Sequence, residues 1–570
     1  MFLTSRPLPL AAVLAAVLAL PCRGEGVPRV KFERELPVTG NYLLLPIANN
    51  RESRSRITVR VDGRLVHRLE VDFPPDGDSI DWWTYLDMKD YTGKTATVTG
   101  NAPAGIPELF ESSGEIRNLA PLYDEALRPQ LRFSQKRGWN NDPNGMLYYD
   151  GEYHFFWQCN PGGWVWANMY WGHAVSTDLI HWTELDRALR PFGGGDADRH
   201  PNMARGECFS GSGNVDLLNT SGWQTGKEAP LVLAFTDTGC GESLAYSNDR
   251  GRTWTYYEGN PIIRHNGRDP KLKWYEPGQH WVIAVFDLTD GDGISIYTSK
   301  DLKSWEFASK VDGFHECAEL VEIAVDDDPA DKRWVMFGAN AQYAVGRFDG
   351  RTFTPGHDGL HRVHYGNYYA SQCFTRPPDG RVVQIGWTRE FPIPGMPFNQ
   401  AFSLPTRLTL RTTADGIRMF AWPIRELEQL RKPGPKVLAG RKLTPAAPTL
   451  ESKAPGQLLD IVATLRRGTA AKALLRFGEN TVTYDFEQQA LDEMPLGMND
   501  GAVTFRVITD RPMYEIVGGE GACYKTCPRA DMGQPLGRVS ITSEGGDLAV
   551  ESLVVHAMRS IWKRSGEAKP

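Results

Sequence analysis

"RGWNNDPNGMLYYDGEYHFFWQ", residues 137–158, changes character partway along its length. It begins as a loop rich in Gly, Asn and Pro, and after Gly145 it becomes an aromatic run with the composition of a β-strand. Asp-Pro and Asn-Gly are strong turn dipeptides, so a hairpin turn alone would explain the loop. Asp142, however, lies between amides and close to Trp139, in front of the aromatic run. The stretch therefore leaves two roles open for Asp142, turn former or catalyst.

This stretch opens a long β-rich region. From about residue 131 to 430 the sequence has many short β-like runs and almost no helical periodicity. Three phrases, "STDLIHW", "SNDRGRTW" and "SKDLKSW", place an Asp a few residues before Trp182, Trp254 and Trp305. A strand–turn–strand phrase that recurs with strands between is typical of propeller blades. The spacings are irregular, so the repeats alone do not give the number of blades.

Further β-rich units flank this region. "ITVRVDGRLVHRLEVDF" alternates around Asp62-Gly63, a good hairpin turn, and predicts a small accessory β-domain over residues 27–105. Its Trp82, Trp83 and Tyr85 fit core and interface packing better than a sugar-stacking platform. "RELEQLRKPGPK", residues 425–436, predicts a short helix followed by a break, after which β segments resume. Residues 440–562 are therefore predicted to form a second β unit, a sandwich.

The N-terminus indicates export. Residues 1–24 have the pattern of a secretory signal, with Arg6 followed by an apolar run from Leu8 to Leu20 that is too short to span a bilayer. No later segment is apolar enough to span one. We expect a secreted or periplasmic protein without a membrane span. Cys22 could instead carry a lipid, but Pro21 before it makes a poor lipoprotein signal.

Charge and cysteine content exclude several classes of partner. The formal net charge of −7 and the pI near 6.0 argue against nucleic acids and anionic membranes. Beyond the signal the cysteines are odd in number and scattered, which is not a disulfide framework. Cys523 and Cys527 are close enough in sequence to pair, and no second Cys or His pair lies nearby to complete a zinc site. We expect no metal and no cofactor.

Three further phrases accompany the opening loop. "ARGECFSGSGNVD" carries Phe209 and Ser210, "NGRDPKLKW" carries Arg268 and Asp269, and "FHECAELVEI" carries Glu316. Any one of them alone is more often structural than catalytic. Together and in this order they resemble glycoside hydrolase family 32, whose members hydrolyse β-fructofuranosides. That family's landmarks are a WMNDPNG loop and Phe-Ser-Gly, Arg-Asp-Pro and Glu-Cys motifs. "WQCNPGG", "YWGHAVSTDLIHW", "FSLPTRLTL" and "MRSIW" are also similar to family text, so the resemblance runs from about residue 131 to 562.

The resemblance implies an all-β fold. A five-bladed β-propeller over residues 125–432 would carry the catalytic site, a C-terminal β-sandwich would follow over residues 440–562, and the small N-terminal β-domain would be an addition. The partner would be an oligo- or polysaccharide with terminal β-fructosyl units. The innermost strands of a propeller converge on one axial funnel, so Asp142, Asp269 and Glu316 could each stand on a separate blade. Asp142 would then be a turn former and a catalyst at once.

Roles follow from the family match. A retaining glycosidase needs a nucleophile and a general acid/base about 5–5.5 Å apart. Asp142 is implied as the nucleophile, Glu316 as the acid/base, and Asp269 as the carboxylate that binds ring hydroxyls and stabilises the developing positive charge. We expect a raised pKa for Glu316, because Asp142 and Asp269 are like charges nearby. The implied substrate-binding residues are Asn141, Gln158, Trp171, Phe209, Ser210, Arg268 and Trp387, although core packing would equally explain the aromatic ones.

Departures from the family pattern concern recognition of the leaving group. Asn140 replaces Met, Cys159 stands where Tyr is common, Ala318 follows Glu-Cys instead of Pro, and Asn367 stands where an acidic residue is frequent. None removes a proposed catalytic carboxylate.

Several alternatives remain open at this point. A levansucrase-type fructosyltransferase usually has Arg after the acid/base Glu, whereas Cys317 stands here. Sialidases share the Asp-containing turns but need an arginine triad and a Tyr nucleophile, and a catalytically dead sugar-binding propeller would not need all three carboxylates. Among substrates, an exported enzyme with an extra domain favours a polymer, levan before inulin, over sucrose alone. That preference rests on analogy between folds.

Overall fold

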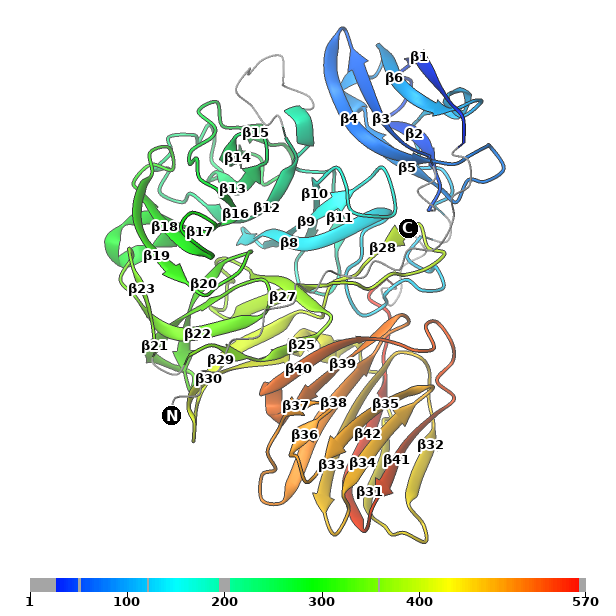
Figure 1. The fold of residues 1–570 in the computed structure, drawn as a ribbon, viewed down its shortest axis with the longest axis vertical. Coiled ribbons are helices and arrows are strands. Elements are labelled where there is room, and N and C mark those ends of the chain that lie inside the picture. Colours follow the sequence, from blue (N-terminus) through cyan, green and yellow to red (C-terminus); the bar gives the residue numbers. More distant parts are fainter. Residues whose placement is uncertain (1–26, 50–52, 120–121, 194–205, 357–358, 563–570) are drawn as a thin grey trace, which may run out of the picture.

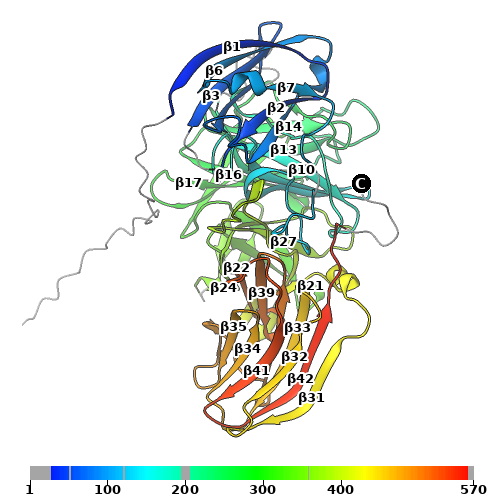
Figure 2. The same cartoon turned by 90° about the vertical axis from the view of Figure 1, so that its right-hand side faces the viewer.

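The computed structural model describes residues 27–49, 53–119, 122–193, 206–356 and 359–562. Three β units follow one another along the chain, and the first and last lie at opposite ends of the long axis with the largest unit between them (Figures 1 and 2). The only helices among the described residues are short 3-10 turns. The fold is therefore all-β, as the sequence predicts. The predicted signal sequence and Cys22 lie outside the described residues.

The N-terminal unit packs two small sheets against each other. Alternating apolar residues of its strands, such as Ile57, Val59 and Val61, face a shared core. The four-stranded sheet has the order β1 (Arg29–Pro37), β6 (Thr95–Pro103), β3 (Ser53–Val61) and β4 (Arg64–Phe73), and the three-stranded sheet has the order β5 (Trp82–Asp87), β2 (Tyr42–Ile47) and β7 (Glu111–Ser113). Strand β7 joins this unit after the boundary expected at residue 105. Trp82 and Trp83 are buried, so they pack rather than present a platform.

The central unit is a propeller with five four-stranded antiparallel blades among the described residues. The first two blades are β8 (Gly138–Tyr149), β9 (Glu152–Asn160), β10 (Tyr170–Ser176) and β11 (Thr183–Glu184), then β12 (Cys208–Val215), β13 (Leu231–Asp237), β14 (Gly241–Ser247) and β15 (Thr255–Tyr256). The next two are β16 (Gly267–Tyr275), β17 (His280–Asp287), β18 (Gly293–Ser299) and β19 (Glu306–Asp312), then β20 (Glu319–Val325), β21 (Asp328–Phe337), β22 (Gln342–Phe348) and β23 (Phe353–Pro355). The fifth comprises β26 (Tyr368–Cys373), β27 (Val382–Thr388), β29 (Thr406–Thr413) and β30 (Gly416–Pro423).

The recurring Asp-Trp phrases form the turn between the third and fourth strands of the first three blades. In the first turn the Asp178 carboxylate accepts hydrogen bonds from the backbone N–H groups of Ile180 and His181. The Trp182 indole N–H donates back to the carbonyl of Leu179 at 3.1 Å. The same Trp-to-carbonyl bond closes the turns of Trp254 and Trp305. The repeats thus have a structural role, because the Asp carboxylate accepts hydrogen bonds from turn N–H groups that have no partner in a neighbouring strand.

The C-terminal unit is a sandwich of two sheets around its own apolar core. One sheet contains β31 (Lys436–Leu443), β33 (Leu459–Arg467), β38 (Ala502–Thr509), β39 (Met513–Gly518), β40 (Cys523–Pro528) and β42 (Leu548–Ala557), with β25 (His364–Gly366) from the propeller on its edge. The other contains β32 (Thr449–Lys453), β34 (Lys472–Phe477), β35 (Asn480–Asp485), β36 (Ala490–Leu491), β37 (Met494–Pro495) and β41 (Arg538–Glu544). A 3-10 helix, Arg425–Leu430, precedes the sandwich where the sequence predicts a short helix.

Cys523 and Cys527 are not paired in the structure. Both are free, as are the other described cysteines. They lie four residues apart on the extended strand β40, which separates them by about 13 Å at the usual rise per residue. A disulfide needs its Cα atoms within about 7 Å, so this strand excludes the pairing that their sequence spacing allows.

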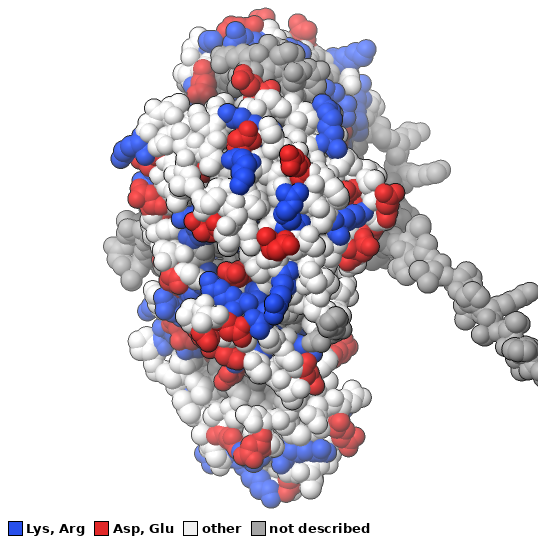
Figure 3. All heavy atoms as spheres, turned by 90° about the vertical axis from the view of Figure 1, so that its left-hand side faces the viewer, with Lys and Arg blue, Asp and Glu red and all other residues white. Residues whose placement is uncertain are grey.

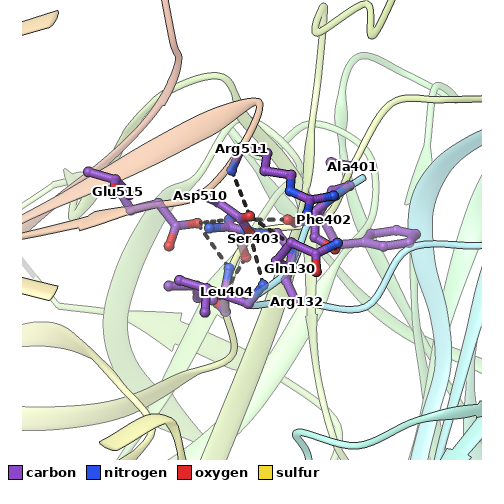
Figure 4. A network of polar contacts seen from close by, with 12 residues as sticks. Gln130, Arg132, Ala401, Phe402, Ser403, Leu404, Asp510, Arg511 and Glu515 are labelled. Atoms are coloured by element: carbon purple, nitrogen blue, oxygen red, sulfur yellow. Dashed lines mark hydrogen bonds and ion pairs between the residues drawn. The ribbon is translucent and has the colours of Figure 1, made fainter. Parts of the chain in front are cut away.

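A buried ionic cluster joins the propeller to the sandwich (Figure 4). Arg132 contacts Asp510 at 3.2 Å and Glu515 at 2.7 Å, and all three side chains are almost completely buried. Asp510 also accepts the backbone N–H groups of Gln130 and Leu131. Glu515 accepts the N–H of Leu404 at 2.9 Å. Each carboxylate therefore binds backbone of the propeller as well as Arg132, and this fixes the two units against each other.

On the face shown in Figure 3, Lys and Arg are interspersed with Asp and Glu rather than gathered by sign. No helix in the described part of the chain is long and apolar enough to cross a membrane.

Candidate active site

Four of the five innermost propeller strands, β8, β12, β16 and β26, have irregular backbone near their start, and Asp142 and Asp269 stand there. The pairing of β8 with β9 is interrupted around Asp142, and that of β16 with β17 around Asp269. A similar irregularity in β12 contains Ser210. A bulge re-aims a side chain that regular alternation would send to a blade face. Successive blades can therefore point these side chains at one place.

Positive φ angles mark Asp269 and the segment around Glu316. Asp269 has φ 68°, Glu316 47° and Cys317 39°. Residues other than Gly seldom adopt this region, and where they do the surrounding structure has to hold them there. Glu316 lies just before β20, in the segment that leads from the third blade into the fourth. A hydrogen bond from the backbone N–H of Cys317 to the Asp269 carboxylate, 3.1 Å long, helps to hold this segment in place.

Asp142 is half-buried and hydrogen-bonded. Ser210 donates to its Oδ2 at 2.6 Å, and the Cys317 thiol lies 3.6 Å from the same oxygen. Burial raises the pKa of Asp142, the hydrogen bonds from Ser210 and Asn141 oppose that rise, and the charge of Glu316 adds to it. Of these effects burial is the largest, so the pKa is raised overall.

Asp269 is the most strongly perturbed carboxyl of the group. Burial, and next the charge of Asp142, raise its pKa to about 8, against opposing contributions from Arg268 and the amide of Cys317. The Cys317 sulfur lies 3.5 Å from Asp269 and 3.6 Å from Asp142, so the two carboxylates share one neighbour. In the ligand-free site a proton is therefore held more readily on Asp269 than on a free aspartate.

Glu316 behaves differently from the expectation of a raised pKa. Burial does raise its pKa, but Arg268, Tyr369 and His315 together outweigh burial and bring the pKa below its ordinary value. Arg268 donates to Oε1, and the Tyr369 hydroxyl donates to Oε2 at 2.9 Å. The expectation was wrong because it counted the like charges nearby and left out the guanidinium that lies between them. Burial, with the like charges as a smaller cause, raises the pKa of Asp269 and Asp142 instead.

A polar chain supports Asp269 from behind. The Asp269 N–H donates to the Thr236 hydroxyl at 2.8 Å, and Thr236 donates to Glu242 at 2.8 Å. Glu242 in turn contacts His265 at 2.8 Å. These three residues come from β13, β14 and the loop before β16, so the second blade holds the strained start of the third.

The predicted binding residues divide into two groups. In the first group, Ser210 donates to Asp142 and Arg268 donates to Glu316. Asn141 adjoins Asp142 in the chain, and its side chain accepts a hydrogen bond from the Trp139 indole at 3.0 Å. Trp387 is partly exposed and packs edge-on to Trp139 and Tyr369.

Gln158 and Trp171 lie beneath the site rather than in it. Gln158 is 1% exposed and donates to the carbonyl of Cys208 at 2.7 Å. Trp171 is fully buried, and its indole N–H points at the carbonyls of Cys208 and Phe209. Both fix the strand that carries Phe209 and Ser210, and Trp171 presents no surface to a sugar.

An aromatic that the sequence analysis missed is exposed nearby. Trp166 is 46% exposed and meets the half-buried Phe209 edge-on, with ring centroids 6.0 Å apart. Its loop is braced by the N-terminal unit. Asn168 exchanges hydrogen bonds with the backbone of Glu70, both at 2.7 Å. The signal for Trp166 in the sequence is a large aromatic in a Gly-rich loop directly after a site strand.

The geometry supplies a chain of contacts from Ser210 through Asp142, Cys317, Asp269 and Arg268 to Glu316 and Tyr369. It brings together three carboxyl groups, and their surroundings raise the pKa of Asp142 and Asp269 and lower that of Glu316. Perturbed pKa values in one place are typical of functional sites. Among the described residues no cluster of three or more His, Cys, Asp or Glu side chains is arranged to hold a metal ion.

Comparison with known proteins identifies the relatives of this chain. A model of the glycosyl hydrolases family 32 N-terminal domain matches residues 132–423. A levanase from Bacillus subtilis is 36% identical over 504 residues, which span 77% of this chain and 72% of the levanase. Invertase 2 from Saccharomyces cerevisiae is 35% identical over 320 residues, half of this chain and 58% of the invertase. The crystal structure of exo-inulinase from Aspergillus awamori superposes with a TM-score of 0.69 at 28% identity, covering 77% of this chain and all of that one.

Proposed function

The chain belongs to glycosyl hydrolase family 32 and is a glycoside hydrolase acting on β-fructosides, and on that premise we propose that it releases fructose from a fructan, levan before inulin. The observation that supports this is the convergence of Asp142, Asp269 and Glu316 on one site from three blades. The relatives named as a levanase and an exo-inulinase favour a polymer. Export of the enzyme, which the N-terminal sequence favours, is part of the same proposal, since polymeric fructan lies outside the cell.

The proposed reaction is a double displacement. Asp142 attacks fructosyl C2 while Glu316 protonates the departing oxygen, and a covalent fructosyl ester forms on Asp142. Water then attacks C2 as Glu316 removes its proton. Esterification removes the charge of Asp142, which lowers the pKa of Glu316 further and suits it to act as a base.

The remaining groups bind and stabilise. Asp269 accepts hydrogen bonds from two ring hydroxyls and stabilises the positive charge that grows at C2. Because its pKa is about 8 in the ligand-free site, sugar binding has to displace the proton from Asp269 or move it to Glu316. Arg268 holds Asp269 and Glu316 in register. Trp166, Phe209 and Trp387 form the apolar walls against which the fructosyl ring and its neighbour pack.

Sucrose is the second candidate substrate, because the matched invertase shares the same region of the chain. Transfer to another sugar is a third, and Cys317 in place of the Arg typical of levansucrases favours water as acceptor. The test is parallel digestion of levan, inulin and sucrose with the purified chain, followed by separation of products by size. Free fructose from levan at the highest kcat/KM supports the proposal. Turnover of sucrose alone, or growth of longer oligosaccharides, contradicts it.

The stereochemistry tests the displacement itself. Time-resolved NMR during hydrolysis should detect β-fructose first, because two inversions restore the starting configuration. Initial release of α-fructose would mean a single displacement by water, with Asp142 as base rather than nucleophile.

A further inference from the structure

His315 lies beside Glu316 at the entrance to the site, and it has no role in the double displacement proposed for Asp142 and Glu316. Its Nε2 is 3.4 Å from Oε1 of Glu316, and its side chain is 43% exposed against 21% for Glu316. Its Nδ1 is 3.5 Å from the carboxylate of Asp292, which follows β17 at the rim of the third blade. The imidazole therefore lies between the half-buried carboxyl of Glu316 and the exposed carboxylate of Asp292.

The imidazole is held in this place by its surroundings. The His315 carbonyl accepts the N–H of Ala339 at 2.8 Å, which anchors the backbone. The ring meets Phe286 edge-on at 5.1 Å, and the guanidinium of Arg268 lies 5.2 Å from the centre of the same Phe286 ring. The orientation of His315 is thus coupled to the packing that also orients Arg268.

The surroundings of Glu316 favour its ionised form, so a nearby proton donor would help it to act as a general acid. A general acid has to carry a proton at the moment the leaving oxygen departs. Arg268 and Tyr369 donate to both oxygens of Glu316 and favour its ionised form. An imidazole, in contrast, can take up and release a proton under mild conditions. The charged groups around His315 are Asp292, Glu316 and Arg268, whose guanidinium donates to the same Oε1 of Glu316 that Nε2 of His315 approaches. An imidazolium here therefore has a carboxylate on either side and shares one of them with Arg268.

We propose that His315 relays the proton that Glu316 gives to the leaving oxygen, and that Asp292 stabilises the imidazolium at the entrance. In the first displacement the Nε2 proton passes to a carboxyl oxygen of Glu316. The proton of Glu316 passes to the glycosidic oxygen, which keeps the electron pair of the broken C2–O bond. In the second displacement the proton taken from water returns by way of His315 to solvent. The proposal rests on the role of Glu316 stated under the proposed function.

The test compares substrates that differ in their need for a proton. His315→Gln should lower kcat/KM on sucrose about 10–100-fold, a fraction of the usual contribution of general acid–base catalysis. On p-nitrophenyl β-fructofuranoside, whose leaving group departs as a stable anion, the loss should stay within about threefold. The alkaline limb of the sucrose pH profile should move to lower pH, because Glu316 alone then carries the proton. Added imidazole should restore part of the sucrose activity of His315→Ala, and Asp292→Asn should show a smaller shift of the same limb.

A matched control is available in the first blade. His181 forms a comparable pair with Asp178, 2.8 Å apart, at the turn before β11, and His181→Gln should leave both profiles unchanged. Equal losses on both substrates with an unmoved alkaline limb would show a merely structural role for His315 and overturn the relay, as would a profile like that of the unmodified protein. Glu316→Gln, assayed alongside, distinguishes failure of the role proposed for Glu316 from failure of the relay alone. If it still hydrolyses sucrose, the assigned role of Glu316 fails. If it does not and His315→Gln is normal, only the relay fails.

Discussion

The Ser210 hydroxyl donates a 2.6 Å hydrogen bond to Oδ2 of Asp142, which joins the innermost strands of the first two blades at the reactive carboxyl. The bond opposes the effect of burial on Asp142, because a donor stabilises the ionised form that burial disfavours. It also fixes one oxygen of the carboxylate, which leaves the other oriented for attack. One contact between blades thus influences both the charge and the orientation of the proposed nucleophile.

Removing this donor should shift the acid limb of the pH profile. A nucleophilic carboxylate works only above its pKa, and Ser210→Ala raises that pKa, so the acid limb of kcat/KM should move to higher pH. At the optimum the loss should be about tenfold, the value of one hydrogen bond to a charged group. Ser304→Ala, at an exposed turn of the third blade, serves as the control. An unmoved acid limb in Ser210→Ala would show that Ser210 does not tune Asp142.

Asp142 itself should be indispensable. Asp142→Asn should reduce hydrolysis of every substrate by several powers of ten, because no other group can form the fructosyl ester. Circular dichroism and the melting temperature should remain close to those of the unmodified protein. Near-normal turnover by the purified variant would return Asp142 to the role of turn former alone.

The sequence identifies the three carboxyl groups that the structure brings together, but it predicts their environment poorly. Asp142, Asp269 and Glu316 each stand in a short local phrase, and the Asp-Trp turns repeat along the chain, so motif reading finds the carboxyl groups and the propeller. The burial of Trp171 depends instead on its register opposite Gln158 and on carbonyls of the next blade. The lowered pKa of Glu316 depends on Arg268, 48 positions away along the chain. Such effects come from contacts between blades, which local sequence patterns do not encode.

The raised pKa of Asp269 should make the free energy of unfolding depend on pH. The folded state holds this proton up to about pH 8, whereas the unfolded chain releases it near the ordinary aspartate value of 3.8. Between these values the folded state binds more protons, so this group lowers the free energy of unfolding as pH rises. Asp269→Asn removes the titrating group, so this decrease in the free energy of unfolding should disappear.

The variant should therefore be inactive and more heat-stable, with a gain that increases from pH 4 to pH 8. Each kcal/mol gained should raise the melting temperature by about 2–4 °C. Differential scanning fluorimetry across this range measures the trend. A difference in melting temperature that stays constant with pH would contradict the assignment of the proton to Asp269.

The ionic cluster between propeller and sandwich should be essential to stability. Arg132→Met leaves Asp510 and Glu515 buried without their cation, which should cost about 3–5 kcal/mol. Adding Glu515→Gln should recover part of that loss, because one unpaired charge disappears. Arg441→Met, at an exposed position of β31, should change the free energy of unfolding by less than about 0.5 kcal/mol. Urea unfolding that does not distinguish Arg132→Met from Arg441→Met would contradict the role given to this cluster.

Glu316 should show its role through the leaving group. Glu316→Ala should abolish release of fructose from substrates with sugar leaving groups, because an alkoxide cannot depart unprotonated at a useful rate. An activated aryl fructoside should retain much of its first step, since its phenolate departs without a proton. Azide should then speed the second step, because this anion attacks the fructosyl ester without a base, and β-fructosyl azide should accumulate as the product. Chromatography of that azide and the ratio of rates on the two substrates provide the measurement. If all substrates lose activity equally and azide has no effect, another residue must be the acid/base.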